Sequence, residues 1–406
     1  MKNLETLIQE LCPDGVEFVK LGDVCEIKGR IGFRGYTRKD LVSESEGAIT
    51  LSPSNIINGN IVYDKCSYIS WAKYEESPEI MAEVGDVVFT KTASVGKTAY
   101  IENMPKEMTI NPQLVLLKKF RGISKYLAYI LKTTYFQNEV KKITGVGSVP
   151  NVPQSSLAKI EIPLPPIEVQ AEIVRILDKF TSLEAELEAE LDCRKRQYEY
   201  YRDKLLSFDT VGGQEVTISK IGDIGRICMC KRIMKNQTNS ESGIPFYKIG
   251  TFGKVADAYI SNDVYEEYKK MYSYPKKGDI LMSASGTIGR TVVFNGEPSY
   301  FQDSNIVWVD NDETKVFNSY LNYYYQIIEW KTQGGTIKRL YNNLLAGATI
   351  KYPSLEEQCR IVSILDRFES LTTSLQSGLP AEIAARRQQY EHYRDKLLTF
   401  KRKGAA

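Results

Sequence analysis

The sequence contains a single histidine, His392, among 406 residues. This excludes metal sites that need several histidines and leaves little scope for a Ser-His-Asp or Cys-His centre. The seven cysteines are scattered and odd in number, so we expect reduced thiols rather than a disulfide framework. No stretch approaches 18 uncharged apolar residues, and residues 1–5 do not begin a secretion signal. These absences predict a soluble cytoplasmic protein and exclude much of enzyme chemistry.

The sequence also lacks a charge excess of either sign. Its 53 basic and 51 acidic residues leave a net charge of +2, so a nucleic-acid partner must be argued from local clusters. The hydrophobic fraction of 42% and charged fraction of 26% are typical of globular proteins. A chain of this length exceeds what one hydrophobic core usually serves, which predicts two or more domains.

An internal repeat is the strongest pattern in the chain. Residues 173–180, IVRILDKF, return as residues 361–368, IVSILDRF. Residues 197–208, QYEYYRDKLLSF, return as residues 389–400, QYEHYRDKLLTF. The segments before these helices match only at short anchors, such as Gly85-Asp86 with Gly278-Asp279. The repeat therefore predicts two similar scaffolds with different surfaces, each followed by a nearly identical helix.

Apolar residues in both repeated segments recur at intervals of three and four, as in a helix that packs on another helix. The first helix is predicted from about Ile167 to Ser207, a length of about 60 Å. Because such a helix is not stable alone, its duplicate is the obvious partner, in an antiparallel coiled coil. Gly378 and Pro380 predict that the second helix kinks or restarts there.

Short β-rich runs at residues 86–90 and 305–309 lie between Gly, Asn and Pro residues, and helices are expected around residues 124–140 and 319–330. The predicted fold class is α+β, with two mixed α/β domains in tandem duplication and two long helices. The predicted boundaries are an N-terminal segment at 1–15, a first domain at 16–166, a central helix at 167–208, a second domain at 209–354, and a C-terminal helix and tail at 355–406.

A tetrapeptide, Leu-Glu-Ala-Glu, occurs twice in the first helix, at residues 183–186 and 187–190. Adding or removing one copy would move the end of the helix by about 6 Å and rotate it by about 40°. A solvated acidic helix face would explain the glutamates equally well. It would not explain two globular domains held at a fixed separation.

Basic residues cluster in spite of the neutral total. Residues 91–142 carry ten lysines and arginines against three glutamates, and residues 28–39 interleave basic residues with glycines and aromatics. Such a segment suits a phosphate backbone, and asparagine, glutamine and arginine can pair with base edges. Ordinary solvated surface lysines are the alternative. The candidate DNA-binding residues are Lys28, Arg30, Arg34, Arg38, Lys91, Ser94, Lys97, Lys231, Arg232, Asn236, Ser285, Thr287, Arg290, Lys338 and Arg339.

Motifs that would indicate catalysis are incomplete. Gly96-Lys97-Thr98 resembles the end of a phosphate-binding loop, but Lys91 stands where that loop needs glycine. Asp14, Glu26 and Lys28 match a permissive nuclease pattern that the second copy lacks. Cys228-Met229-Cys230 has no second pair of ligands for zinc. We predict no catalytic and no metal-binding residues in this chain.

Taken together, the sequence resembles the DNA-specificity (S) subunit of type I restriction-modification systems, possibly of the IC type, over nearly its whole length. The resemblance rests on the two divergent domains, the Gly-Asp…Gly-Lys/Arg segments, the repeated helices and two exits from the domains. These exits are residues 165–170, PPIEVQ, and residues 353–358, PSLEEQ. Ser354 replaces the second proline of the first exit, and Gly378 with Pro380 interrupts the second helix.

The resemblance implies a non-catalytic subunit in which each divergent domain is a target-recognition domain for one half of a split double-stranded DNA sequence. The paired helices would set the spacing and dock two methyltransferase subunits. S-adenosylmethionine, ATP and Mg²⁺ are expected on those partners and on the restriction subunits. We expect docking on the outward faces of the helices, at Arg194, Arg196, Tyr201, Arg202, Arg386, Arg387, Tyr393 and Arg394. The target sequence does not follow from these residues.

Two other functions remain open at this stage. One is a coiled-coil adaptor that joins proteins without touching DNA, which the near-zero net charge favours slightly. The other is a nuclease that uses Asp14, Glu26 and Lys28. Charge reversal in the basic clusters separates the first from a DNA-binding subunit, and metal-dependent cleavage by the isolated chain would identify the second.

Overall fold

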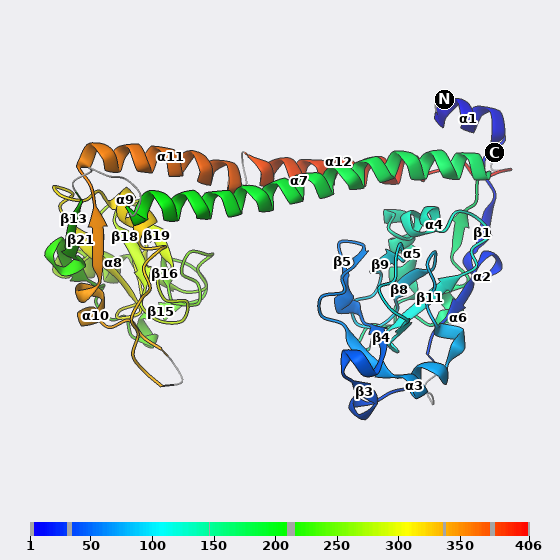
Figure 1. The fold of residues 1–406 in the computed structure, drawn as a ribbon, viewed down its shortest axis with the longest axis horizontal. Coiled ribbons are helices and arrows are strands. Elements are labelled where there is room, and N and C mark those ends of the chain that lie inside the picture. Colours follow the sequence, from blue (N-terminus) through cyan, green and yellow to red (C-terminus); the bar gives the residue numbers. More distant parts are fainter. Residues whose placement is uncertain are drawn as a thin grey trace. The chain divides into compact units, whose positions relative to one another are not determined.

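The computed structural model describes residues 4–30, 35–145, 147–208, 216–335, 338–373 and 378–404. The chain forms two compact units, drawn in Figure 1. Unit 1 consists of Met1–Glu188 with Glu382–Ala406, and unit 2 of Ala189–Ala381. The helix α7 (Ile167–Ser207) contributes its first half to unit 1 and its second half to unit 2. Its bounds are those that the apolar spacing predicts.

The central sheet of unit 1 is antiparallel, with the strand order β2-β11-β8-β9. Every residue of β8 and β11 is buried because the sheet is covered on both faces. Val87 and Phe89 belong to a core shared with the helices α4 and α5, and Val88 belongs to a core shared with a second sheet. The bounds are β2 Glu26–Lys28, β8 Val87–Thr90, β9 Thr98–Tyr100, β11 Leu114–Lys118, α4 Ser124–Leu131 and α5 Thr134–Ile143.

The second sheet of unit 1 has the order β10-β4-β7-β3, with β10 and β4 parallel. Its bounds are β3 Leu41–Val42, β4 Gly47–Leu51, β7 Ser67–Ser70 and β10 Met108–Ile110. The smaller elements of this unit are α1 Leu4–Leu11, β1 Phe18–Lys20, α2 Leu21–Val24, β5 Ile56–Ile57, β6 Asn60–Ile61, α3 Trp71–Glu75, α6 Gln154–Leu157 and β12 Glu161–Pro163.

The segment after α12 (Leu379–Leu397) closes unit 1 at the edge of the β1–β12 pair. Val16 pairs with Arg402 in a parallel bridge, and Arg402 also forms an ion pair with Glu161 at 2.6 Å. Its guanidinium lies 4.4 Å from the ring centre of Phe18. Leu398 is buried in the main core of the unit. Residues from both ends of the sequence thus build one domain.

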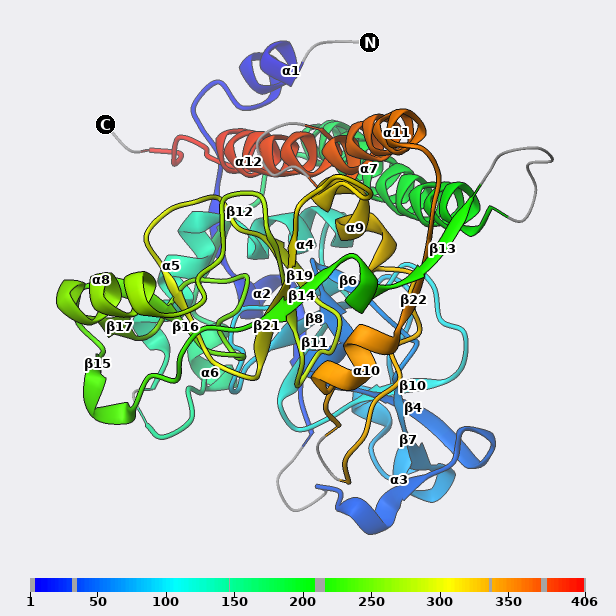
Figure 2. The same ribbon diagram turned by 90° about the vertical axis from the view of Figure 1, so that its left-hand side faces the viewer.

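Unit 2 repeats this plan. Its central sheet has the order β14-β21-β18-β19, and its second sheet has the order β15-β17-β16-β20 with β16 and β20 parallel. The bounds are β14 Gly225–Cys228, β15 Thr238–Asn239, β16 Ile244–Tyr247, β17 Tyr259–Ile260, β18 Ile280–Ser283, β19 Thr291–Val293, β20 Tyr300–Phe301 and β21 Ile306–Asn311. The pair β13 (Thr217–Lys220) and β22 (Thr349–Tyr352) lies side by side in Figure 2.

The remaining helices of unit 2 are α8 Asn262–Met271, α9 Asn318–Tyr324, α10 Asn342–Gly347 and α11 Leu355–Thr373. The single helix expected at residues 319–330 ends at Tyr324, and Tyr325, Ile327, Ile328 and Trp330 pack against the core of unit 2 beyond its end. The helix expected at residues 124–140 is two helices. Thr133 separates them, since its hydroxyl caps the N–H of Phe136 and bonds to the carbonyl of Ile130.

The repeated exit segments, residues 165–170 and 353–358, hold the start of α7 and of α11 against their own domains. In unit 1 the Gln170 amide accepts from the N–H of Ile123 and donates to the carbonyl of Pro165. In unit 2, Gln358 makes the same two contacts with Phe317 and Pro353. Both glutamines are buried. Part of the sequence repeat is therefore explained by the seating of each helix on its domain.

The second repeated helix is divided, as Gly378 and Pro380 predict. α11 ends at Thr373 and α12 begins at Leu379, and Gly378 has a φ of +86°. In unit 1, Phe180 of α7 stacks on Tyr393 of α12 with ring centres 5.6 Å apart. In unit 2, Tyr201 of α7 stacks on Phe368 at 5.8 Å. Within each unit, the two helix segments thus use equivalent aromatic pairs.

Candidate nucleic-acid interface

Three loops meet at one end of the central sheet in unit 1. We call this surface platform 1; it consists of residues 91–97, 111–113 and 144–152, without residue 146. Lys91 N–H donates to the carbonyl of Gln113, and Val152 N–H donates to the carbonyl of Lys91. Isolated bridges pair Asn151 with Thr92 and with Gly145. The backbone hydrogen bonds between loops hold their exposed side chains at fixed positions.

Unit 2 builds the same surface from different residues. We call it platform 2; it consists of residues 284–290, 302–305 and 331–340, without residues 336 and 337. Ala284 N–H donates to the carbonyl of Asn305, and Leu340 N–H donates to the carbonyl of Ala284. Isolated bridges pair Arg339 with Ser285 and with Gln333. Arg339 therefore takes the backbone position that Asn151 has in platform 1.

The polar side chains on the two platforms differ. Platform 1 carries the exposed Asn151, and the hydroxyl of Thr92 donates to its Oδ1 at 2.8 Å. Platform 2 carries Arg339, whose Nη2 donates to the Oδ1 of Asn305 at 2.8 Å. Beside it, Arg232 contacts the carboxylate of Asp303 at 3.0 Å. At the equivalent backbone position, platform 1 therefore carries an amide and platform 2 carries a guanidinium group.

Several predicted residues lie on or beside these platforms with their side chains accessible. Ser94, Thr287 and Lys338 are exposed, and Ser285 is half-buried. Lys91 is half-buried, and this burial lowers its pKa below the usual range. In the segment that follows β14, Lys231, Arg232 and Asn236 are exposed. Lys231 lies 5.0 Å from the ring centre of Tyr272.

Lys97 and Arg290, the cations of the repeated Gly-Asp…Gly-Lys/Arg segments, contact the protein backbone. The ammonium of Lys97 donates to the carbonyls of Pro53 and Ile56 at 3.1 and 3.4 Å. Nη2 of Arg290 donates to the carbonyl of Ile249 at 3.1 Å. In unit 1 this cation connects the loop between β8 and β9 to the segment after β4. In unit 2 it connects the loop between β18 and β19 to the segment after β16. The repeat at this point therefore has a structural explanation.

The described residues of the first basic cluster lie in different surroundings. Arg30 is only 4% exposed and donates to Thr109 Oγ1 and to the carbonyl of Ile110, both at 3.4 Å. Burial lowers the pKa of Arg30, and this cation is fixed inside unit 1 because both acceptors belong to β10. Lys28 forms an ion pair with Glu26 at 3.3 Å, and Arg38 is exposed. Arg34 lies outside the described residues.

The predicted docking residues on the long helices divide into two sets. Arg194, Arg196 and Arg386 are exposed and form ion pairs with acids on their own helix. The other five residues contact groups within their own unit. Among them Arg394 is buried and does not lie on an outward face, whereas Tyr201 and Tyr393 remain exposed. Tyr201 and Tyr393 stack on Phe368 and Phe180, Arg202 bonds to Gln326, Arg387 bonds to Glu184 and Glu188, and Arg394 is buried.

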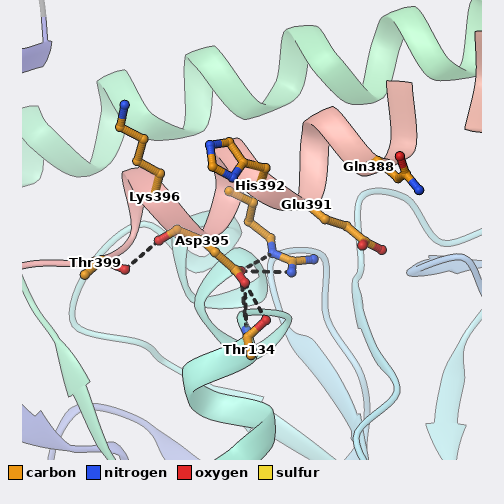
Figure 3. Close-up of a pocket in the computed structure, with 8 residues that line it drawn as sticks. Thr134, Gln388, Glu391, His392, Asp395, Lys396 and Thr399 are labelled. Carbon is orange, nitrogen blue, oxygen red and sulfur yellow. Dashed lines mark hydrogen bonds and ion pairs between the residues drawn. The ribbon is translucent and has the colours of Figure 1, made fainter. Parts of the chain in front are cut away.

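Arg394 is buried beside Asp395, which Figure 3 shows at the start of α5. Its neighbour Asp395 points at the first residue of α5, where it accepts the backbone N–H of Thr134 at 3.3 Å and the hydroxyl of the same residue. The Arg394 guanidinium contacts this carboxylate at 2.9 Å. The pair lines an open pocket of about 480 Å³ together with His392 and Lys396. Asp395 thus caps a helix of the domain from the repeated helix.

The described residues contain no cluster of three or more His, Cys, Asp or Glu side chains that could hold a metal ion. Glu26 of the nuclease-like pattern forms ion pairs with Lys28 and with Lys119, at 3.3 and 2.9 Å. These bonds lower its pKa. Cys228 and Cys230 are buried free thiols. In the part of the chain that the structure describes, no helix is both long and apolar enough to cross a bilayer.

Asn151, Gln113 and Thr92 are platform residues that the sequence did not single out. Asn151 lies in a run of Gly, Val, Ser and Pro with no charge, so charge clustering could not find it. A usable signal was the position of this run. Residues 145–151 precede the exit at Pro165 by the same number of positions as residues 333–339 precede the exit at Pro353. Aligning the two copies backward from the exits would have shown Asn151 opposite Arg339 or one of its neighbours.

Comparison with known proteins identifies this architecture. Residues 13–192 and 213–385 each match the family model of the type I restriction modification DNA specificity domain. The chain belongs to this family, with two copies of the domain.

Two curated relatives are individual members of such systems. A putative type I restriction enzyme specificity subunit of Haemophilus influenzae is 57% identical over 256 residues, and the EcoR124I/EcoR124II specificity subunit of Escherichia coli is 34% identical over 270 residues. These matches cover 61% and 60% of this chain. They span 66% and 64% of the two relatives, slightly less than two thirds of each. A chain in a solved structure of a type I restriction-modification system has the same fold, with a TM-score of 0.60, 21% identity and coverage of 95% and 97% of the two chains.

Proposed function

We propose that this chain is the DNA-specificity subunit of a type I restriction-modification complex, and that platform 1 and platform 2 each recognise one half of a bipartite target in double-stranded DNA. The observation that carries the proposal is the pair of platforms, in which one backbone arrangement displays different hydrogen-bonding side chains. Two half-sites of different sequence need such a pair. The names of the relatives support the same function.

In this proposal the chain acts in the cytoplasm and carries no catalytic residue. Methyltransferase subunits supply S-adenosylmethionine chemistry, and restriction subunits supply ATP-driven translocation and Mg²⁺-dependent cleavage. The exposed arginines Arg194, Arg196 and Arg386 are the candidate docking residues for the methyltransferase subunits. The other predicted docking residues contact groups within their own unit, and they would also keep the helix pair in place.

The test is a genome-wide map of methylated adenines in cells with and without this chain, in the presence of its modification subunit. We expect one motif, made of two short specific halves around a fixed unspecific gap, to lose methylation when the chain is absent. If methylation is unchanged, the proposal is wrong and an adaptor without DNA binding becomes the better hypothesis. Charge reversal at Arg196 and Arg386 is expected to weaken assembly of the complex, measured by size-exclusion chromatography.

A further inference from the structure

Asn151 and Arg339 occupy the same backbone position in two surfaces that otherwise differ. Asn151 is bridged to Thr92 in the loop between β8 and β9, and Arg339 is bridged to Ser285 in the loop between β18 and β19. The residue after each donates its N–H to the carbonyl of the first residue of that loop, Lys91 or Ala284, at 2.8 or 2.9 Å. The equivalence is therefore one of hydrogen bonding, and it does not depend on an alignment of two dissimilar sequences.

Each of these side chains is also oriented by one neighbour. The hydroxyl of Thr92 donates to Oδ1 of Asn151 at 2.8 Å and fixes the plane of the amide. This contact uses one lone pair of Oδ1, so the other lone pair and the Nδ2 donors remain for a ligand. Asn151 is exposed, which leaves its amide edge accessible. An asparagine amide in this state can accept from N6 and donate to N7 of adenine.

Arg339 is held in a corresponding way. Its Nη2 donates to Asn305 Oδ1 at 2.8 Å and contacts the hydroxyl and carbonyl of Ser304 at 3.3 and 3.4 Å. Within the described part of the chain, Nη1 and Nε of Arg339 make no recorded hydrogen bond. A guanidinium that is fixed at one nitrogen loses less side-chain entropy when its other donors bind. Its planar fork matches O6 and N7 of guanine.

We propose that Asn151 and Arg339 are equivalent base-recognising residues, Asn151 for an adenine in one half of the target and Arg339 for a guanine in the other half. This inference rests on the proposed function. Thr92 and Asn305 act as positioning residues, because each contacts the recognising side chain and holds its plane. The two units would thus recognise different bases with the same hydrogen-bonding scaffold.

The test compares methylated motifs in cells that express the full chain or a variant together with its modification subunit. Asn151→Asp has the same shape and can still accept from Thr92, but it loses the donor to N7. We expect the preference for adenine to fall about ten- to hundredfold at a single position of one half, with the other half unchanged. Arg339→Lys keeps the charge and loses the planar fork, so the preference for guanine should fall at a single position of the opposite half.

Matched controls make the same chemical change elsewhere. Asn103→Asp alters an exposed asparagine of unit 1 outside platform 1, and Arg360→Lys alters an exposed arginine of α11 in unit 2. Both should leave the motif unchanged. Thr92→Val tests the same base position indirectly. It removes the hydroxyl that orients Asn151 and keeps the backbone bridge between the loops. It should weaken the preference at the position that Asn151→Asp changes.

The outcomes separate the inference from the function on which it rests. If the wild-type chain directs no bipartite methylation, the proposed function fails and the inference fails with it. If the wild-type motif is bipartite but neither Asn151→Asp nor Thr92→Val alters any base preference, only the inference is overturned. It is also overturned if either change weakens methylation equally at all sites, because a purely structural role predicts that result.

Discussion

Arg387 of α12 donates to Glu184 of α7, with Nε and Oε1 2.5 Å apart. The same guanidinium also bonds to Glu188, so each Leu-Glu-Ala-Glu tetrad supplies one carboxylate to one arginine. These bonds keep the pKa of Arg387 above its usual value. The tandem repeat therefore fixes the position of α12 along the first half of α7. The acidic face that the sequence left unexplained has a specific partner within unit 1.

Deletion of residues 187–190 should preserve this contact and change the target. After the deletion Leu191 and Asp192 follow Glu186 directly, so Asp192 takes the place of Glu188 opposite Arg387. The rest of α7 moves by about 6 Å and turns by about 40°. Under the proposed function, the unspecific gap of the methylated motif should shorten by about one or two base pairs. A folded complex with an unchanged gap would contradict this mechanism.

The aspartates of the two RDKLL segments should differ in importance despite their identical surroundings in sequence. Asp395→Ala removes an acceptor for the N–H of Thr134 at the start of α5 and leaves the buried Arg394 without its carboxylate. We expect the free energy of unfolding of unit 1 to fall by about 1–3 kcal/mol. Asp203 is largely exposed, so Asp203→Ala should cost less than about 0.5 kcal/mol. Chemical denaturation of both variants checks the contrast, and equal losses would be inconsistent with it.

Lys132 should make unit 1 more stable as the pH rises. Burial, and then the charges of Arg394 and Lys125, lower the pKa of Lys132 to about 8 from its ordinary value near 10.5. Between these values the unfolded chain binds a proton that the folded chain does not, so stability increases with pH from about 8 to about 10.5. Lys132→Met should remove this increase. The measurement is the free energy of unfolding against pH for both proteins.

An identical pH dependence in Lys132→Met and the wild type would contradict the role assigned to Lys132.

Arg30 and Arg38 come from one basic cluster but should behave differently. Arg30→Ala leaves the buried acceptors of β10 without their donor, and we expect it to lower the free energy of unfolding by about 2 kcal/mol. Arg38→Ala changes an exposed side chain and should affect stability by less than about 0.5 kcal/mol. If Arg38 contacts a phosphate, the salt dependence of DNA binding should decrease in this variant alone. Binding titrations at several salt concentrations make the comparison.

The long helix was the most predictable part of the chain. Its apolar residues at intervals of three and four, together with the proline-marked exit, gave the bounds Ile167–Ser207, and Gly378 with Pro380 gave the division between α11 and α12. These features are local, since each depends on residues within a few turns of one another.

Features that depend on contacts between distant segments could not be predicted in this way. Nothing in the residues next to Arg30 indicates that it donates to β10, some 80 positions away. The near-identity of the repeated helices suggested two docking surfaces, whereas Arg394 is buried and Tyr393, although exposed, stacks on Phe180 of the partner helix. Asn151 could not be found in this way because its place on platform 1 depends on a bridge to Thr92. Charge patterns identify exposed cations, and they do not identify uncharged residues placed by a distant loop.

The bridge between Val16 and Arg402 has a consequence for the order of synthesis. Unit 2 is continuous in sequence, whereas unit 1 needs α12 and Leu398 to complete its core. A ribosome therefore releases all of unit 2 before the final segment of unit 1 emerges. The domain that begins first finishes last, and a nascent chain stopped near residue 381 would present an unclosed first domain beside a complete second one.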